Sequence, residues 1–249
     1  ELTGADGGER YTQFVQILRT PETQGKLWAK YPVAVRFLVD RLANWVAMVL
    51  EFFERLIDDY DDLCEQDVIS RGAELRATFA TGDAHNQGRA VIILREGDEA
   101  GVVYKPRSAD IDLAFSSFVR MINESDARAD IQLPRVVERG SYSWHEFIAA
   151  QPAVGDQANR DLAYRLGVLN AMILALSGND FHHENILVKG SHPVPIDFET
   201  VSHPETRAAV QKFDDYLDFS ARAVRESGAN IGILPGKIVS QGQDETVAS

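Results

Sequence analysis

Two short polar segments in the C-terminal half carry the residue types that phosphoryl transfer requires. The first, NDFHHEN, occupies residues 179–185, and the second, PIDFET, occupies residues 195–200. Asp180 and Asn185 are five positions apart, as are the aspartate and asparagine of the protein-kinase catalytic loop H-R-D-x-x-x-x-N. Asp197 comes twelve positions after Asn185 and precedes a phenylalanine, where a kinase carries its D-F-G aspartate. The spacing therefore predicts a nucleotide site.

The predicted chemistry assigns a different task to each polar side chain. Asp180 is expected to meet the incoming hydroxyl, while the amide oxygen of Asn185 and the carboxylate of Asp197 hold Mg²⁺ against the phosphates. The alternative is that Asp180 and Asn185 merely form turns and that Asp197 is a turn or cap residue, since each type is common there. The joint pattern, with a long helix before Asp180 and a strand before Asp197, favours the nucleotide site.

Adjacent histidines beside carboxylates raise a second alternative, a transition-metal site. His182 and His183 are neighbours in sequence, so they point in different directions in most backbones, and no H-E-x-x-H pattern is present. Cys64 is the single cysteine, which leaves neither a cysteine-based zinc site nor a disulfide framework. A zinc centre is therefore the less favoured interpretation.

Basic and glycine-rich residues upstream fit the same nucleotide hypothesis. Lys105 ends the apolar run VVYK, much as the β3 lysine of kinases ends V-A-I-K, where an ammonium group can neutralise phosphates. The alternative is a surface lysine at a strand end. The segment GDAHNQG, residues 82–88, lies where kinases carry a glycine-rich flap. Asp83 and His85 in it could act on the phosphates or a peptide, or stabilise the turn.

The elements that must position these residues follow from hydrophobic periodicity and turn signals. Helices are predicted at residues 10–19, 32–63, 111–122, 159–177 and 206–225, and strands at residues 78–80, 90–95, 101–105, 134–139, 186–188 and 194–197. The first three strands should form an antiparallel meander. Asp110 is the expected N-cap of the third helix, Gly178 the residue that ends the fourth, and residues 140–147 an irregular segment.

The long predicted helix carries one apolar stripe at alternating steps of three and four. Its members are Leu38, Leu42, Trp45, Val49, Phe53 and Leu56. Such a stripe usually packs into a core, and a docking face for a partner helix is the alternative.

Composition narrows the class of protein. The 249 residues carry a net charge of -13, which argues against a general nucleic-acid or anionic-membrane binder. The apolar runs are too short to cross a bilayer, so stable membrane insertion is not expected. The low cysteine content fits a reducing cytoplasm.

A set of motifs resembles the dehydratase domain of class II (LanM-type) lanthipeptide synthetases across about residues 28–236. They are GDxH at 82–85, YKPRS at 104–108, WHEF at 144–147, DxHxEN at 180–185 and DxET at 197–200. The resemblance implies an α+β fold related to lipid and protein kinases, with two lobes. It also implies ATP- and Mg²⁺-dependent phosphorylation of Ser and Thr in a precursor peptide, followed by elimination to dehydroalanine or dehydrobutyrine.

The same resemblance assigns roles by position. It implies that Asp180, His182 and Asn185 act in the catalytic loop. ATP would be bound by Lys105, Arg107, Asp83 and His85. The magnesium site would be Asn185, Asp197 and Glu199.

The predicted organisation has four parts. Residues 1–9 form a disordered tail, 10–72 an N-terminal helical segment, 73–150 a small sheet-and-helix lobe, and 151–249 a partial second lobe with the catalytic and metal loops. The cyclase domain of the family is not expected in this sequence, and the chain begins with Glu rather than Met. We therefore expect a fragment of a longer synthetase, a truncated gene product, or one part of a split enzyme that works with a cyclase. A silent peptide-binding module and a small-molecule kinase are the competing hypotheses.

Overall fold

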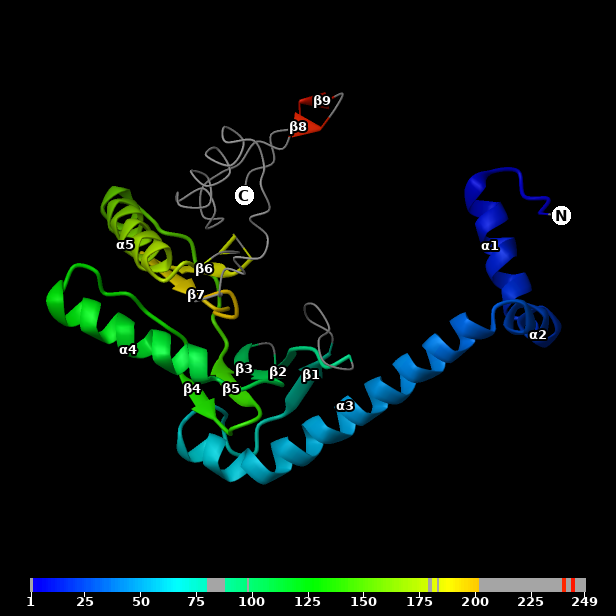
Figure 1. Cartoon of the computed structure of the whole chain (residues 1–249), viewed down its shortest axis with the longest axis horizontal. Helices are drawn as coiled ribbons and strands as arrows, with labels where there is room; N and C mark the ends of the chain where they lie inside the picture. Colours follow the sequence, from blue (N-terminus) through cyan, green and yellow to red (C-terminus); the bar gives the residue numbers. More distant parts are fainter. Residues whose placement is uncertain are drawn as a thin grey trace, which may run out of the picture. The chain divides into compact units, whose positions relative to one another are not determined.

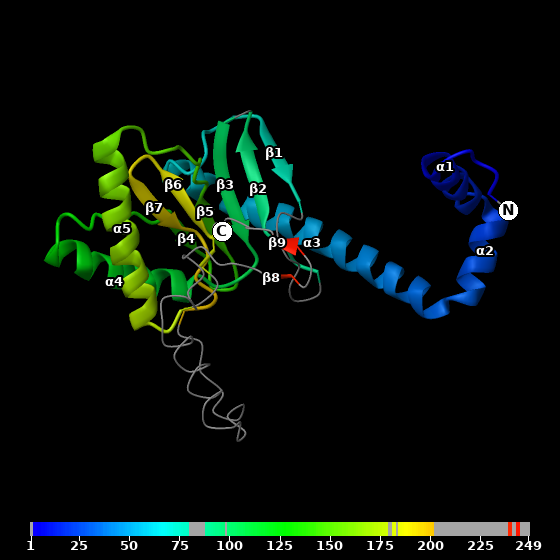
Figure 2. The same cartoon turned by 90° about the horizontal axis from the view of Figure 1, so that it is seen from above.

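A computed structural model describes residues 2–79, 88–97, 99–178, 181–182 and 184–201, together with the short strands β8 (Val239–Ser240) and β9 (Gln243–Asp244). The chain divides into two compact units (Figures 1 and 2). The first comprises Glu1–Asp61 and Gly82–Ala90, and the second comprises Asp62–Thr81 and Val91–Ser249.

The first unit begins with a helix that reaches into the predicted tail. Helix α1 spans Gly7–Leu18, so a disordered tail over residues 1–9 is wrong for residues 7–9. Asp6 caps the helix, because its carboxylate accepts a hydrogen bond from the Glu9 amide at 2.8 Å. The Glu9 carboxylate in turn accepts from the Ala5 amide at 2.7 Å. This reciprocal pair resembles a capping box and explains the earlier start.

Two more helices follow α1 along the chain. Helix α2 spans Pro21–Lys30 and was not predicted from the sequence. Thr20 and Pro21 do end the first helix, but they also start the next, with Thr20 as N-cap and Pro21 in the first turn. Helix α3 spans Pro32–Glu65 and confirms the predicted long helix.

The apolar stripe of α3 is buried only near its C-terminal end. Leu38 and Leu42 are 62% and 63% exposed, whereas Leu56 is 9% exposed. Core packing along the whole stripe was therefore a wrong prediction. Periodicity identifies an apolar helix face, but it does not supply the partner that covers that face.

A five-stranded antiparallel sheet forms the first half of the second unit. Its strands are β1 (Leu75–Thr78), β2 (Ile92–Glu96), β3 (Glu99–Lys105), β4 (Val136–Glu138) and β5 (Ser143–Glu146), in the order β1-β2-β3-β5-β4. Figure 2 shows β1, β2 and β3 side by side. The predicted meander is confirmed, with Ile93 opposite Val103 in the β2–β3 pair, but its first strand is Leu75–Thr78 rather than residues 78–80.

Strand β5 lies where an irregular segment was predicted. It pairs with β3, which places Trp144 opposite Tyr104 and Ser143 opposite Lys105. Ser143, Trp144 and His145 are all buried, so both faces of this strand are covered. The alternation of polar and aromatic residues was misleading, because the polar face of β5 contacts other buried groups rather than solvent.

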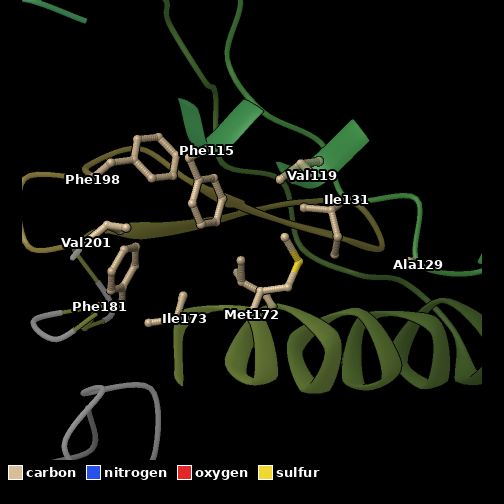
Figure 3. Close-up of a cluster of buried hydrophobic side chains, with 10 residues drawn as sticks. Phe115, Val119, Ala129, Ile131, Met172, Ile173, Phe181, Phe198 and Val201 are labelled. Carbon is tan, nitrogen blue, oxygen red and sulfur yellow. The ribbon is translucent and has the colours of Figure 1, made fainter. Parts of the chain in front are cut away.

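Two helices and a hairpin form the second half of this unit. They are α4 (Asp110–Ser125), α5 (Asp156–Ala175), β6 (Ile186–Lys189) and β7 (His192–Pro195). Their apolar side chains meet in one core, where the Phe115 ring of α4 lies 4.7 Å from that of Phe198 (Figure 3). Ile173 and Met172 of α5 point into the same cluster. This core fixes the segment after β7 beside α4.

Two predicted helix ends are corrected. Ala109, not Asp110, is the N-cap of α4, and the Ser108 hydroxyl accepts from the Asp110 amide at 3.1 Å. At the end of α5 the left-handed residue is Ser177, with φ +53°, and not Gly178. The Gly178 amide donates to the Ile173 carbonyl at 2.9 Å, which completes a Schellman motif.

The mixture of helices and sheet agrees with the predicted α+β class. The relation to kinases stays a prediction, and the helix expected at residues 206–225 lies outside the described residues. Among the helices that the structure describes, none is both long and apolar enough to cross a membrane.

Candidate functional site

Lys105, at the end of β3, reaches the segment that follows β7. Its ammonium donates a hydrogen bond to the Ile196 carbonyl at 2.6 Å, and the residue is 8% exposed. Burial lowers the pKa of Lys105, and the positive charge of Arg107 lowers it further. The nearby carboxylates act in the opposite direction. The surface-lysine alternative is therefore wrong, and Lys105 is a buried cation beside the predicted metal ligands.

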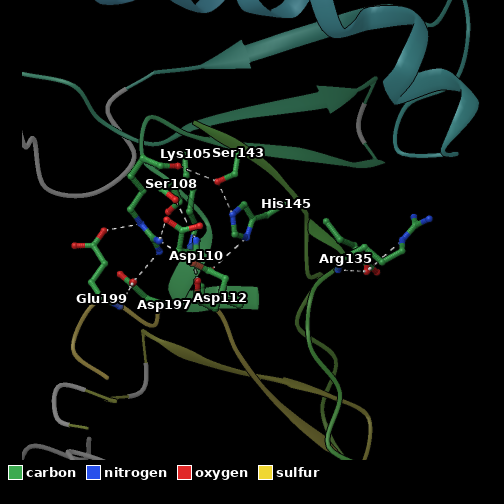
Figure 4. Close-up of polar contacts among 12 residues, drawn as sticks. Lys105, Ser108, Asp110, Asp112, Arg135, Ser143, His145, Asp197 and Glu199 are labelled. Atoms are coloured by element: carbon green, nitrogen blue, oxygen red, sulfur yellow. Dashed lines mark hydrogen bonds and ion pairs between the residues drawn. The ribbon is translucent and has the colours of Figure 1, made fainter. Parts of the chain in front are cut away.

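Arg107 contacts three carboxylates through three different nitrogen atoms. Nη1 lies 2.8 Å from Asp112 Oδ2, and Nη2 lies 3.3 Å from Asp197 Oδ1. Nε lies 2.8 Å from Glu199 Oε1. Burial alone would lower the pKa of Arg107, but the three carboxylates outweigh it and raise that pKa above its ordinary value. Figure 4 shows Asp112, Asp197 and Glu199 gathered near Lys105.

Asp197 and Glu199 occupy the turn that follows β7. The Glu199 amide donates to Asp197 Oδ1 at 3.2 Å, which fixes the two residues relative to each other. Their side chains are 41% and 45% exposed, so both carboxylates keep oxygen atoms accessible to a ligand. The structure thus brings together two predicted metal ligands and the two predicted phosphate-binding cations.

Asn185 lies next to this turn because of the β6–β7 ladder. Ile186 pairs with Pro195, and the Ile196 amide donates to the Asn185 carbonyl at 2.9 Å. The Asn185 amide donates in turn to the His182 carbonyl, also at 2.9 Å. His182 Nδ1 accepts from the Glu184 amide at 3.2 Å, so the imidazole stabilises this loop. Spacing in the sequence therefore placed Asn185 correctly beside the Asp197 segment.

Three predicted site residues lie outside the described residues. They are Asp180, Asp83 and His85. Their roles in catalysis and phosphate binding stay predictions.

Three buried polar residues belong to the site but were not predicted. The Asp112 side chain of α4 is 1% exposed, and its Oδ1 lies 3.7 Å from Nδ1 of His145. His145 Nε2 lies 2.9 Å from the Ser143 hydroxyl, which donates to the Arg107 carbonyl at 3.2 Å. A usable signal was the polar pair Ser143 and His145 flanking a tryptophan in a segment next to β3.

His145 is neutral in the folded protein. Burial is the largest cause, and the positive charges of Lys105 and Arg107 add to it, so that the pKa of His145 is lowered to about 2. Asp112 approaches the ring but does not reverse this shift. Among the residues that the structure describes, the charged groups gathered around Arg107 are therefore two cations and three carboxylates.

The arrangement fits a magnesium–nucleotide complex. Mg²⁺ is usually held by one or two carboxylates together with substrate phosphates and water, and Asp197 with Glu199 supplies the two carboxylates. Lys105 and Arg107 are the side-chain types that bind phosphate oxygens. Among the described residues, no group of three or more His, Cys, Asp or Glu side chains is arranged to hold a metal ion by itself.

Comparison with known proteins identifies the family. The model of the family described as "Domain of unknown function (DUF4135)" matches residues 31–249. The chain belongs to this family. This DUF4135 chain is also 25% identical, over 209 residues, to the "Lacticin 481/lactococcin biosynthesis protein LcnDR2" of Lactococcus lactis subsp. lactis. The match covers 80% of this chain and 22% of the relative, so the chain spans about a fifth of the relative's length. The resemblance to LanM-type lanthipeptide synthetases is thereby confirmed.

Proposed function

We propose that this chain carries the nucleotide site of a lanthipeptide dehydratase, and that it phosphorylates Ser and Thr residues of a precursor peptide with ATP and Mg²⁺. The observation that carries the proposal is the convergence of Lys105 and Arg107 with Asp197 and Glu199. The similarity to a lacticin and lactococcin biosynthesis protein supports a peptide substrate. An ATP-dependent modification also fits a cytoplasmic location, with a cyclase as the next enzyme or domain.

The protein's own groups have separate roles in this proposal. Lys105 and Arg107 bind phosphate oxygens, and Asp197, Glu199 and Asn185 hold the magnesium ion. Bound ATP supplies the phosphoryl group, and Mg²⁺ offsets its negative charge. Asp180 takes the proton from the Ser or Thr hydroxyl. The hydroxyl oxygen bonds to the γ-phosphorus of ATP, and the bond between that phosphorus and the departing ADP breaks. His182 supports the loop that contains Asn185.

The second half of the proposed reaction needs no further ATP. Removal of the α proton and cleavage of the bond between the β carbon and the phosphate oxygen would release phosphate and leave the dehydroamino acid. None of the described residues is assigned to this elimination. The proposal for this chain is therefore phosphorylation, with elimination placed in the complete synthetase.

Nucleotide binding is the direct test. Mg²⁺–ATP should raise the melting temperature of the intact chain, and Lys105→Ala and Asp197→Ala should abolish the rise. Lys26→Ala is the matched control, because Lys26 is 75% exposed and forms an ion pair at 2.6 Å with its exposed helix neighbour Glu22. Absence of any nucleotide-dependent shift in the wild-type chain would refute the proposal.

Incubation with ATP and a precursor peptide then tests the substrate. A product heavier by one phosphate group supports the peptide kinase. Peptide binding without phosphate incorporation would instead indicate the silent binding module, and phosphorylation of small molecules alone would indicate a small-molecule kinase.

A further inference from the structure

Arg107 is held on two sides by carboxylates of different character. On one side is Asp112, whose side chain is 1% exposed. On the other side are Asp197 and Glu199, whose side chains are 41% and 45% exposed. The guanidinium is therefore shared between one buried anion and two that solvent and ligands can reach.

Breaking the ion pair between Arg107 and the buried Asp112 is energetically costly. Removing the charge partner of a buried ion is strongly destabilising, because the remaining charge is left uncompensated. Oδ2 of Asp112 is hydrogen-bonded to Arg107 Nη1 at 2.8 Å, whereas its buried Oδ1 has no hydrogen-bond partner among the described residues. Asp112 therefore depends on Arg107. Asp197 and Glu199 can exchange the guanidinium for water or for a cation, because both are partly exposed.

The neighbouring buried groups hold Arg107 without competing for its charge. The Ser143 hydroxyl donates to the Arg107 carbonyl at 3.2 Å and fixes the backbone from β5. His145, 2.9 Å from that hydroxyl, is neutral at ordinary pH because burial lowers its pKa to about 2. Lys105 also interacts electrostatically with Asp112, but the cation that is hydrogen-bonded to its carboxylate is Arg107.

We propose that Asp112 is a positioning residue that keeps Arg107 in place while its guanidinium exchanges Asp197 and Glu199 for the phosphate oxygens of the nucleotide. In the nucleotide-free protein Arg107 takes the place of the divalent cation on these two carboxylates. When the cation occupies them, Asp112 keeps the guanidinium close enough to bind phosphate. This inference rests on the proposed function and adds to it the residue that determines where Arg107 acts.

Asp112 could act through its negative charge alone or by positioning Arg107, and these two roles predict opposite effects of Asp112→Asn on ATP affinity. If Asp112 acted only through its charge, removing a negative charge near a polyphosphate would strengthen ATP binding. If it positions Arg107, its loss weakens ATP binding, because a bidentate guanidinium–phosphate contact depends on orientation. ATP affinity therefore separates the two roles, independently of any catalytic rate.

The experiment measures two ligands on the intact chain. Binding of Mn²⁺ alone is followed by electron paramagnetic resonance, and binding of ATP with Mg²⁺ by calorimetry. Arg107→Gln should bind Mn²⁺ alone more tightly than wild type and ATP on the order of tenfold more weakly, as expected for one charged contact. Asp112→Asn should also weaken ATP binding on the order of tenfold, but it should weaken Mn²⁺ binding as well, because Asp197 and Glu199 are then the carboxylates left to Arg107 among the described residues.

Controls keep the outcomes distinct. In the Arg107→Gln background, Asp112→Asn should no longer weaken ATP binding. Asp110→Asn, an exposed change on the first turn of the same helix, should leave both affinities unchanged. Arg107→Lys is the substitute if Asp112→Asn does not fold. A lysine still neutralises Asp112 but lacks the planar fork, so Mn²⁺ should bind more tightly and ATP more weakly.

The outcomes separate the two proposals. A wild-type chain that binds no ATP overturns the proposed function and this inference with it. A wild-type chain that binds ATP, with Asp112→Asn binding it equally well or better, overturns the role of Asp112 alone. An Arg107→Lys variant that binds Mn²⁺ and ATP with wild-type affinities would likewise overturn the role of Asp112 alone.

Discussion

Acidification should destabilise the second unit through His145, because this imidazole is buried in its neutral form. The residue is 3% exposed, and the groups facing it are Ser143 and Asp112, with the cations Lys105 and Arg107 nearby. In the unfolded chain the imidazole titrates with its ordinary pKa of 6.5, whereas in the folded chain that pKa is about 2. The unfolded state therefore binds an extra proton between these two values.

The magnitude follows from this difference in proton uptake. Above pH 6.5 neither state is protonated at His145, so the full stability is present. As the pH falls below 6.5 toward 2, the free energy of unfolding decreases by about 1.4 kcal/mol per pH unit for one such group. Allowing for partial titration near 6.5, the loss between about pH 7 and about pH 5 is about 2 kcal/mol.

The assay compares the wild-type chain with His145→Gln, whose amide can still meet the Ser143 hydroxyl. Urea unfolding at both pH values gives the free energy of unfolding for each protein, and carboxylates that titrate elsewhere cancel in the difference. The wild-type chain should lose about 2 kcal/mol more than the variant. Parallel losses in the two proteins would refute the assignment of a neutral, buried His145.

Two further predictions concern packing and use matched pairs. A Cβ at Gly101 would lie 1.7 Å from the Leu94 carbonyl oxygen, so Gly101→Ala should reduce the free energy of unfolding by more than about 2 kcal/mol. A Cβ at Gly167, within α5, would lie in open space, so Gly167→Ala should raise the free energy of unfolding by roughly 0.5–1 kcal/mol. Equal effects at the two positions would contradict this reasoning. Phe52 is fully buried whereas Leu42 is 63% exposed, so Phe52→Ala should cost about 3–5 kcal/mol and Leu42→Gln less than about 0.5 kcal/mol in urea titrations. A large loss for Leu42→Gln would show that the apolar face of α3 is covered within the chain.

The sequence was most informative where the structure is local. Asn185 and Asp197 lie together because a tight hairpin joins them, and such a hairpin follows from turn signals and strand patterns over a dozen residues. Lys105 was predicted as a site residue because it ends an apolar strand, and the meander that contains this strand is confirmed. The long helix α3 was equally clear, because its apolar period extends over many turns.

What escaped prediction depends on contacts between distant segments. In the sequence, Asp112 is an ordinary acidic residue in the first turn of a predicted helix. Its burial against Arg107 is evident only in the folded structure. His145 likewise lies in a stretch whose polar residues suggested a loop, because burial on both faces of β5 is invisible in the pattern. For the same reason the periodicity of α3 could not show which part of its stripe is covered.

The pairing of Lys105 with Ile196 and of Arg107 with Asp197 joins residues about ninety positions apart. Contacts at such separation form late in folding, because the intervening chain must first be brought together. During synthesis the segment that contains Lys105 and Arg107 would emerge long before Asp197 and Glu199, and Arg107 would then have Asp112 as its carboxylate partner. The close pair within residues 107–112 can thus form from local sequence alone, before translation reaches Asp197 and Glu199.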